Sequence, residues 1–260
     1  MASLSKEIVL VTGANSGIGF ELARQLLAKG TYHVLLGARS PDRGTTALRS
    51  LQSQNHPGSI EFLHLDLQDD TTIANAASSI TASHGRLDVL VNNAAVASYT
   101  ASDRQAFRDA FDTNATGPYL LTKALISLLR KSANPRIVNV SSGAGSIGRR
   151  LTPASPMYKI QAEPYRASKA AMNILMTCQY VEYGLNYNVE GEPVQEGEEK
   201  RVKVFAYDPG FTVSNLSEAN TKENGARSAE DTVKSLMDVV EGKRDGEVGR
   251  FIHNSGGYPW

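Results

Sequence analysis

The sequence contains little cysteine, no long apolar run and no excess of charge of either sign. Its single cysteine, Cys178, excludes an internal disulfide framework. No apolar stretch reaches membrane-spanning length, and residues 1–7 show no signal-peptide pattern. The 27 basic and 27 acidic residues cancel, which gives no support for a nucleic-acid or membrane partner. We therefore expect a cytoplasmic protein that acts on small molecules.

The sequence does contain short apolar segments that alternate with helical patterns. The expected strands cover residues 7–11, 33–38, 60–65, 87–91, 136–140, 202–207 and 249–253. The expected helices cover about 17–30, 41–53, 70–84, 102–131 with a break near Asn114, 165–182 and 227–241. Helix-length connections between strands predict right-handed crossovers and an α/β fold with a doubly wound parallel sheet of about seven strands and helices on both faces. No repeat or linker divides residues 1–260, so one domain is expected.

Polar residues and glycines follow the predicted strands at their carboxyl ends. The residues in these positions are Gly13, Arg39, Asp66, Asn92, Ser142 and Pro209. Because ligands of such sheets bind beyond the carboxyl ends of the strands, these six positions predict one site.

A glycine-rich turn joins the first predicted strand to the first helix. A pyrophosphate binds at such turns, where glycines let the backbone approach and helix amides face the ligand. The spacing is G-x-x-x-G-x-G, and a glycine trio alone also fits a plain turn. The strand before it and the helix after it favour a dinucleotide site. The expected cofactor contacts here are Gly13, Asn15, Ser16, Gly17, Ile18 and Gly19.

Tyr165 and Lys169 are four residues apart and therefore share one face of a helix. An ammonium held beside a phenol favours the phenolate, which suits proton transfer near neutral pH. A tyrosine–lysine pair by itself is usually only a surface pair, so its interpretation depends on the other motifs.

Taken in order, these motifs resemble the short-chain dehydrogenase/reductase family, in its carbonyl-reductase-like branch. The resemblance covers roughly residues 6–256. The motifs that carry it are Thr12–Gly19 (T-G-x-x-x-G-x-G), Asn92–Ala95 (N-N-A-G, with alanine in the last place), Asn114, Ser142, Tyr165–Lys169 (Y-x-x-x-K) and Pro209-Gly210. The resemblance implies a Rossmann-like NAD(P)-binding domain.

The resemblance also implies the catalytic roles. Tyr165 would be the acid/base, and Ser142 would donate a hydrogen bond to the reacting oxygen. Lys169 would hold the cofactor ribose and favour the tyrosinate. Asn114 would kink its helix and hold a water that leads protons to Lys169.

The end of the second strand favours NADP(H) over NAD(H). NAD-preferring sites usually carry an acid there, whereas this chain has Ala38 followed by Arg39. A guanidinium suits a 2′-phosphate. Arg43 is an alternative or additional partner, and Ser16 lacks the positive charge that many NADP-preferring relatives carry.

Further cofactor contacts are implied by the resemblance. Asp66 and Leu67 would flank the adenine, and Asn93 would lie along the ribose. The segment near the nicotinamide would include Pro209, Gly210, Thr212 and Ser214, of which the last two differ from the common valine and threonine.

Two segments are longer than in typical relatives. The first, near 149–164, contains three prolines and predicts an ordered, non-helical loop over the site. Within it Arg149, Arg150, Met157 and Tyr158 are expected either to line a pocket or only to cover the loop. Tyr158 is not followed by a lysine four residues later, which excludes it as the catalytic tyrosine. The second, near 186–200, is acidic and predicts a solvated excursion.

The sequence predicts an NADPH-dependent reductase of a ketone or aldehyde, with no metal. Two alternatives stay open: the same site as an alcohol dehydrogenase, and a non-redox enzyme or regulator that uses the cofactor site as a scaffold. Phe211, Leu216, Tyr258 and Trp260 are candidate apolar contacts for the substrate. A monomer or homodimer is expected, because the two insertions flank the helix that begins near Tyr165.

Overall fold

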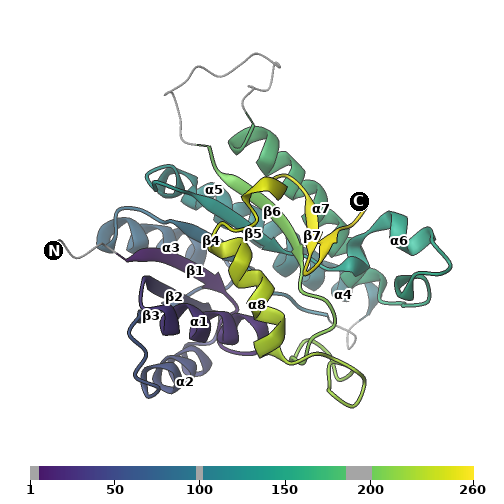
Figure 1. Cartoon of the computed structure of the whole chain (residues 1–260), viewed down its shortest axis with the longest axis horizontal. Helices are drawn as coiled ribbons and strands as arrows, with labels where there is room; N and C mark the ends of the chain where they lie inside the picture. The colour runs from purple at the N-terminus through teal and green to yellow at the C-terminus, as the bar shows by residue number, and fades with distance from the viewer. Residues whose placement is uncertain (1–5, 98–101, 186–200) are drawn as a thin grey trace.

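The computed structural model describes residues 6–97, 102–185 and 201–260. Within them one eight-stranded sheet has the order β3-β2-β1-β4-β5-β6-β7-β8 (Figure 1). Its strands are β1 (Glu7–Thr12), β2 (Tyr32–Ala38), β3 (Ser59–His64), β4 (Val89–Asn92), β5 (Arg136–Val140), β6 (Lys203–Asp208), β7 (Phe251–His253) and β8 (Gly256–Gly257). The order reverses between β1 and β4, which creates a crevice at the carboxyl ends of the central strands.

Helices cover both faces of this sheet (Figure 1). They are α1 (Gly17–Lys29), α2 (Pro41–Gln52), α3 (Asp70–Ser83), α4 (Asp103–Phe111), α5 (Gly117–Leu129), α6 (Ile147–Leu151), α7 (Glu163–Tyr183) and α8 (Ala229–Val240). One apolar core lies under α1, α2 and α8, and the other lies under α3, α5 and α7. The central strands are buried on both faces, which explains their nearly continuous apolar sequence. The predicted single-domain α/β fold is confirmed.

The helix expected over 102–131 is interrupted near Asn114, as predicted. A π-helix, η1 (Asp112–Thr116), separates α4 from α5. The extra residue of a π-turn breaks the ordinary hydrogen-bond ladder, and such segments occur frequently at functional sites.

Two predictions about the elements need correction. The sheet has eight strands rather than about seven, because β8 pairs antiparallel with β7. The segment near 149–164 is not wholly non-helical, because it overlaps α6 and contains the 3₁₀-helix Pro156–Tyr158. Prolines are compatible with both elements: Pro153 follows the end of α6, and Pro156 occupies the first turn of the 3₁₀-helix, where its missing N–H costs no bond. The acidic insertion predicted near 186–200 lies outside the described residues.

Candidate active site

A cleft of about 1510 Å³ opens at the carboxyl ends of the strands. Small-molecule pockets usually measure about 300–1,000 Å³, so this cleft has room for a ligand larger than most. Every predicted catalytic or cofactor-contacting residue lines it except Gly19 and Asn114, and Asn92, at the end of β4, does not line it either. Gly19 and Asn114 are buried next to residues that do line it: the missing Cβ of Gly19 leaves room for Asn93, and Asn114 is hydrogen-bonded to Val96.

The glycine-rich turn has the backbone geometry that the prediction requires. Gly13 has φ +65°, a left-handed conformation that side chains disfavour, and a Cβ there would lie 2.9 Å from Ala94 Cα. The turn leads into α1, whose first turn carries no acidic residue, and whose N-cap Ser16 makes no side-chain capping bond. The first amides of α1 therefore remain available to an anion.

Asn93 fixes the glycine-rich turn from the neighbouring strand. Its Nδ2 donates to the backbone oxygen of Thr12 at 2.8 Å, and its backbone N–H donates to Thr12 Oγ1 at 2.9 Å. A Cβ on Gly19 would lie 2.6 Å from the same Nδ2. Asn93 thus lines the cleft, as predicted, but its amide is engaged by the turn that it supports.

The part of the cleft next to the end of β2 carries two exposed guanidinium side chains. Arg39 follows β2, and Arg43 lies in the first turn of α2; both line the cleft. Neither forms an ion pair with any residue in the described ranges. Asp66 and Leu67 line the same cleft. An anionic group would therefore meet two exposed cations at this end.

Asn114 is fully buried and joins three parts of the site. Its Oδ1 accepts from Val96 N–H at 2.8 Å, while its Nδ2 donates to Val96 O at 2.8 Å and to Ser168 Oγ at 2.9 Å. Ser168 lies in α7 and donates in turn to Tyr165 O at 2.8 Å. The amide side chain therefore ties the loop after β4 to the helix that carries Tyr165.

The adjacent serines after β5 have different surroundings. Ser141 is buried and donates to Asn173 Oδ1 of α7. Ser142 lines the cleft, where its Oγ accepts from Ala144 N–H at 3.1 Å. That bond occupies an oxygen lone pair, and the hydroxyl proton remains able to serve a ligand.

Lys169 is buried to 1% exposure beside Tyr165. Its Nζ donates to Val140 O at 2.7 Å and lies 5.8 Å from the centre of the Tyr165 ring. Burial lowers the pKa of Lys169 to about 8, against the opposing effect of the Asp208 charge. Tyr165 and Lys169 thus lie on the same face of α7, as predicted, and both line the cleft together with Ser142.

Residues of the segment Pro209–Ser214, all except Val213, also line the cleft. Asp208 Oδ1 accepts from Gly210 N–H at 2.8 Å, which fixes the turn. Thr212 is buried, and its Oγ1 bonds to Thr232 Oγ1 of α8 at 3.0 Å. The Thr212 hydroxyl therefore has an internal partner.

Only some of the residues that we expected near the substrate line the cleft. Arg149, Met157, Phe211, Leu216 and Tyr258 line the cleft, whereas Arg150, Tyr158 and Trp260 do not. The Arg150 guanidinium instead donates to backbone oxygens of Tyr158 and Ile160 and covers the loop. Tyr158 is exposed, consistent with its exclusion as the catalytic tyrosine.

Sequence reasoning missed Asp208, which lines the cleft near Arg149. The Arg149 guanidinium lies 4.0 Å from the centre of the Tyr258 ring. A Cβ on Gly143 would lie 2.1 Å from Arg149 Nη1 and 3.0 Å from Asp208 Oδ2, so both side chains lie beside this glycine. The position of Asp208 next to Pro209 was the available signal. Nothing local in the sequence joins it to Arg149.

The chain belongs to the short-chain dehydrogenase family of oxidoreductases. The family model for short chain dehydrogenase matches residues 7–225. The chain is 33% identical to the short-chain dehydrogenase/reductase tropE of Talaromyces stipitatus, over 98% of each chain. It is 34% identical to the short-chain dehydrogenase anuI of Penicillium roqueforti, over 91% of this chain and 89% of that protein.

A solved structure of the same fold is the NADPH-bound carbonyl reductase from chicken fatty liver. It has a TM-score of 0.79 and 27% identity, and the match covers 100% of this chain and 96% of that chain. An alcohol dehydrogenase from Thermococcus sibiricus, complexed with 5-hydroxy-NADP, shares the fold with a TM-score of 0.72 at 21% identity, over 91% of each chain. Among the described residues, no helix is long and apolar enough to cross a membrane.

Proposed function

We propose that this protein is an NADPH-dependent carbonyl reductase that converts a ketone or aldehyde to an alcohol, with Tyr165 as the acid/base. One observation carries the proposal. Ser142, Tyr165 and the buried Lys169 share one cleft with the glycine-rich turn. Hydride transfer from the cofactor and proton transfer from Tyr165 could therefore take place in the same cleft. The likeness to an NADPH-bound carbonyl reductase supports the same function.

The shape and the polar groups of the cleft suit a dinucleotide. A side chain on Gly13 or Gly19 would fill the space beside the turn, and the amides of α1 suit the pyrophosphate. Arg39, with Arg43 beside it, would hold the 2′-phosphate that distinguishes NADP(H), and Lys169 would hold the ribose next to the nicotinamide. When bound, the nicotinamide supplies the hydride.

The chain's own residues handle the oxygen and the proton. Ser142 donates a hydrogen bond to the carbonyl oxygen, whose negative charge grows in the transition state. Tyr165 gives its proton to that oxygen as the alcohol forms. The Lys169 ammonium stabilises the tyrosinate that remains, and Asn114 holds α7 at the required position through Ser168.

The reverse reaction uses the same residues. If the alcohol is the substrate, Tyr165 receives its proton and Ser142 stabilises the forming carbonyl oxygen. The ratio of oxidised to reduced cofactor then decides the direction. A non-redox role is disfavoured because Asn114, Ser142, Tyr165 and Lys169 are all present in a connected arrangement.

Oxidation of NADPH with a panel of ketones and aldehydes tests the proposal. We expect Tyr165→Phe to lower kcat/KM by about 10²–10⁴-fold, the usual contribution of general acid catalysis. Tyr158→Phe is the matched control, because Tyr158 is exposed and lies outside the cleft. Unchanged turnover in Tyr165→Phe, or no NADPH oxidation with any carbonyl, would refute the proposal.

A further inference from the structure

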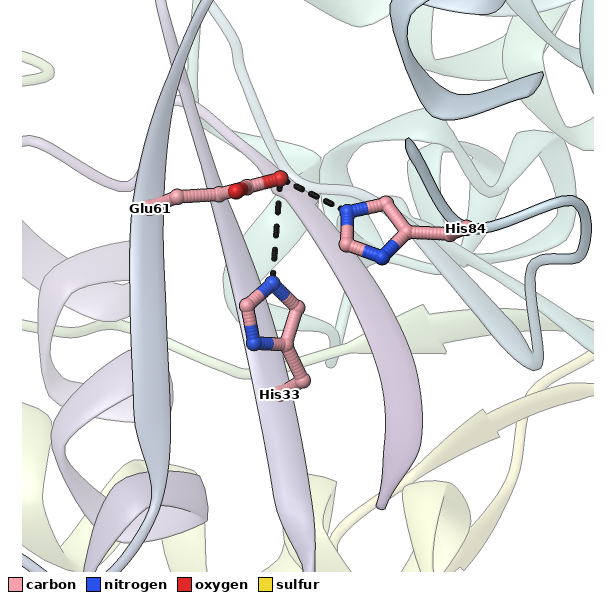
Figure 2. A group of neighbouring side chains, drawn as sticks. All are labelled: His33, Glu61 and His84. Atoms are coloured by element: carbon pink, nitrogen blue, oxygen red, sulfur yellow. Dashed lines mark hydrogen bonds and ion pairs between the residues drawn. The ribbon is translucent and has the colours of Figure 1, made fainter. Parts of the chain in front are cut away.

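Two histidines and a glutamate converge at the amino-terminal edge of the sheet, away from the cleft. His33 lies at the start of β2, Glu61 lies in β3, and His84 follows the end of α3. Figure 2 shows both imidazole rings directed at the same carboxylate. Glu61 Oε1 lies 2.7 Å from His84 Nε2 and 3.7 Å from His33 Nε2. One ligand atom from each residue lies within 4.8 Å of the other two.

The strand register brings these residues together. His33 pairs with Ser59, and Leu35 pairs with Glu61. Since side chains two residues apart on a strand share a face, His33, Ser59 and Glu61 all lie on one face. Leu35 belongs to the core under α3, so this is the face that α3 covers. His84 is the C-cap of that helix and therefore lies over the same edge.

His33 Nε2 is buried and makes no hydrogen bond within the described residues, and Glu61 Oε1 lies 3.7 Å from it. The other ring nitrogen, Nδ1, lies 2.8 Å from Ser59 Oγ. When Nδ1–H donates to that hydroxyl, the lone pair of Nε2 points toward Glu61 and His84. Metal-binding histidines are usually held by such a bond from the other ring nitrogen.

We propose that His33, Glu61 and His84 bind a divalent transition metal ion, with zinc as the best match. Two imidazole nitrogens and one carboxylate oxygen are common zinc ligands, and three protein ligands leave a fourth position for water. The exposed fraction of the Glu61 side chain is 46%, against 19% for His33 and 16% for His84. The site thus has an entrance on the side of Glu61.

The chemistry of the group suits a metal. A tetrahedral zinc with bonds of about 2.0–2.1 Å separates its ligand atoms by roughly 3.3 Å, so only small side-chain shifts are required. His84 exchanges its hydrogen bond to Glu61 for a bond to the ion.

The site is separate from the proposed oxidoreductase chemistry. His33 and Arg39 are six residues apart along β2, which corresponds to roughly 20 Å. A bound ion would connect β2, the edge strand β3 and the end of α3. We therefore expect the metal to stabilise the fold and not to take part in hydride transfer.

Zinc titration of the tag-free, chelator-treated full chain tests the proposal. We expect one Zn²⁺ per chain by calorimetry and by elemental analysis after gel filtration. We also expect the midpoint of thermal unfolding to rise with zinc concentration. His33→Gln and His84→Gln should each weaken Zn²⁺ binding by about 10-fold or more. Cobalt should give the absorption spectrum of a nitrogen-ligated tetrahedral ion.

His56→Gln is the matched control, because His56 is partly exposed, hydrogen-bonds Gln54 and lies outside the cluster. It should bind zinc as the unsubstituted chain does. Circular dichroism and NADPH binding establish that each variant is folded. Failure of the unsubstituted chain to bind stoichiometric Zn²⁺ would overturn the proposal. Equal binding by folded His33→Gln and His84→Gln variants would also overturn it, and would leave the cluster as a hydrogen-bonded group only.

Discussion

The ammonium of Lys169 lies 2.7 Å from the backbone oxygen of Val140, at the last residue of β5. A helix side chain is thereby attached to the strand end that leads into Ser142. The attachment buries a positive charge within reach of the Tyr165 ring. Its energetic consequence is a pKa of about 8 for Lys169, lowered by burial.

This pKa predicts how stability changes with pH. The ordinary value for lysine is 10.5, so between about pH 8 and 10.5 the unfolded chain holds a proton that the folded chain lacks. Raising the pH through this window therefore favours the folded state, by up to about 1.4 kcal/mol per pH unit. Below pH 8 both states are charged, and the cost of burying the charge is fully present.

Urea unfolding at several pH values between 7.5 and 10 measures this effect. Lys169→Met should lose the rise in unfolding free energy relative to the unsubstituted chain. Lys131→Met, at an exposed position, should keep it. Parallel pH profiles for the unsubstituted chain and Lys169→Met would show that burial does not lower the pKa of Lys169 in this way.

Arg39 should decide the preference between cofactors. We expect Arg39→Ala to weaken NADPH binding by about 10–100-fold, because a charged hydrogen bond contributes about 1.5–3 kcal/mol. NADH, which lacks the 2′-phosphate, should bind nearly as before. Fluorescence titration with both cofactors measures the ratio. Arg49→Ala is the control, since Arg49 is an exposed residue of α2 that does not line the cleft. Equal losses for NADPH and NADH would contradict the assignment.

Asn114 should matter for both stability and turnover. Asn114→Ala removes the buried partners of both backbone polar groups of Val96 and the bond to Ser168. We expect the free energy of unfolding to fall by about 1–3 kcal/mol. The rate kcat should also fall, because α7 loses a constraint next to Tyr165. Urea unfolding and steady-state kinetics measure the two effects. Asn224→Ala, at an exposed position, should change neither quantity. An Asn114→Ala variant as stable as the unsubstituted chain would show that the Asn114 hydrogen bonds to Val96 and Ser168 do not stabilise the fold.

Gly143 should control where Arg149 lies. A methyl group on Gly143 would overlap Arg149 Nη1, the end of a flexible side chain, so the guanidinium must move. We expect Gly143→Ala to fold, with less than about 3 kcal/mol of destabilisation. It should alter the relative kcat/KM values across the carbonyl panel in the same way as Arg149→Ala.

The double variant sharpens this test. If both substitutions remove the same group from the cleft, their effects on kcat/KM should not add. Gly246→Ala is the control, because no atom lies within 4 Å of the added Cβ. Additive effects of Gly143→Ala and Arg149→Ala would mean that the two positions act independently.

Much of the fold could be predicted because its signals are local. The apolar runs of β1 and β5 and the glycine-rich turn are each readable within ten residues of sequence. The elements that were missed depend on pairing or packing partners rather than on an apolar pattern of their own. The last strand of the sheet, β8, contains only two glycines and exists because it pairs with β7 across a short turn. The five-residue α6 is supported by Gly148 N–H, which donates to Trp260 O.

The same division applies to the sites. The sequence by itself determined which groups are available for catalysis, because motif spacing along a helix or at a strand end is a property of the local chain. It could not determine that Lys169 is buried against Val140 or that Arg149 lies over Tyr258. It also could not join His33 to His84. These contacts link segments that are far apart in the chain, and only the register of the sheet and the packing of helices on it decide such distances.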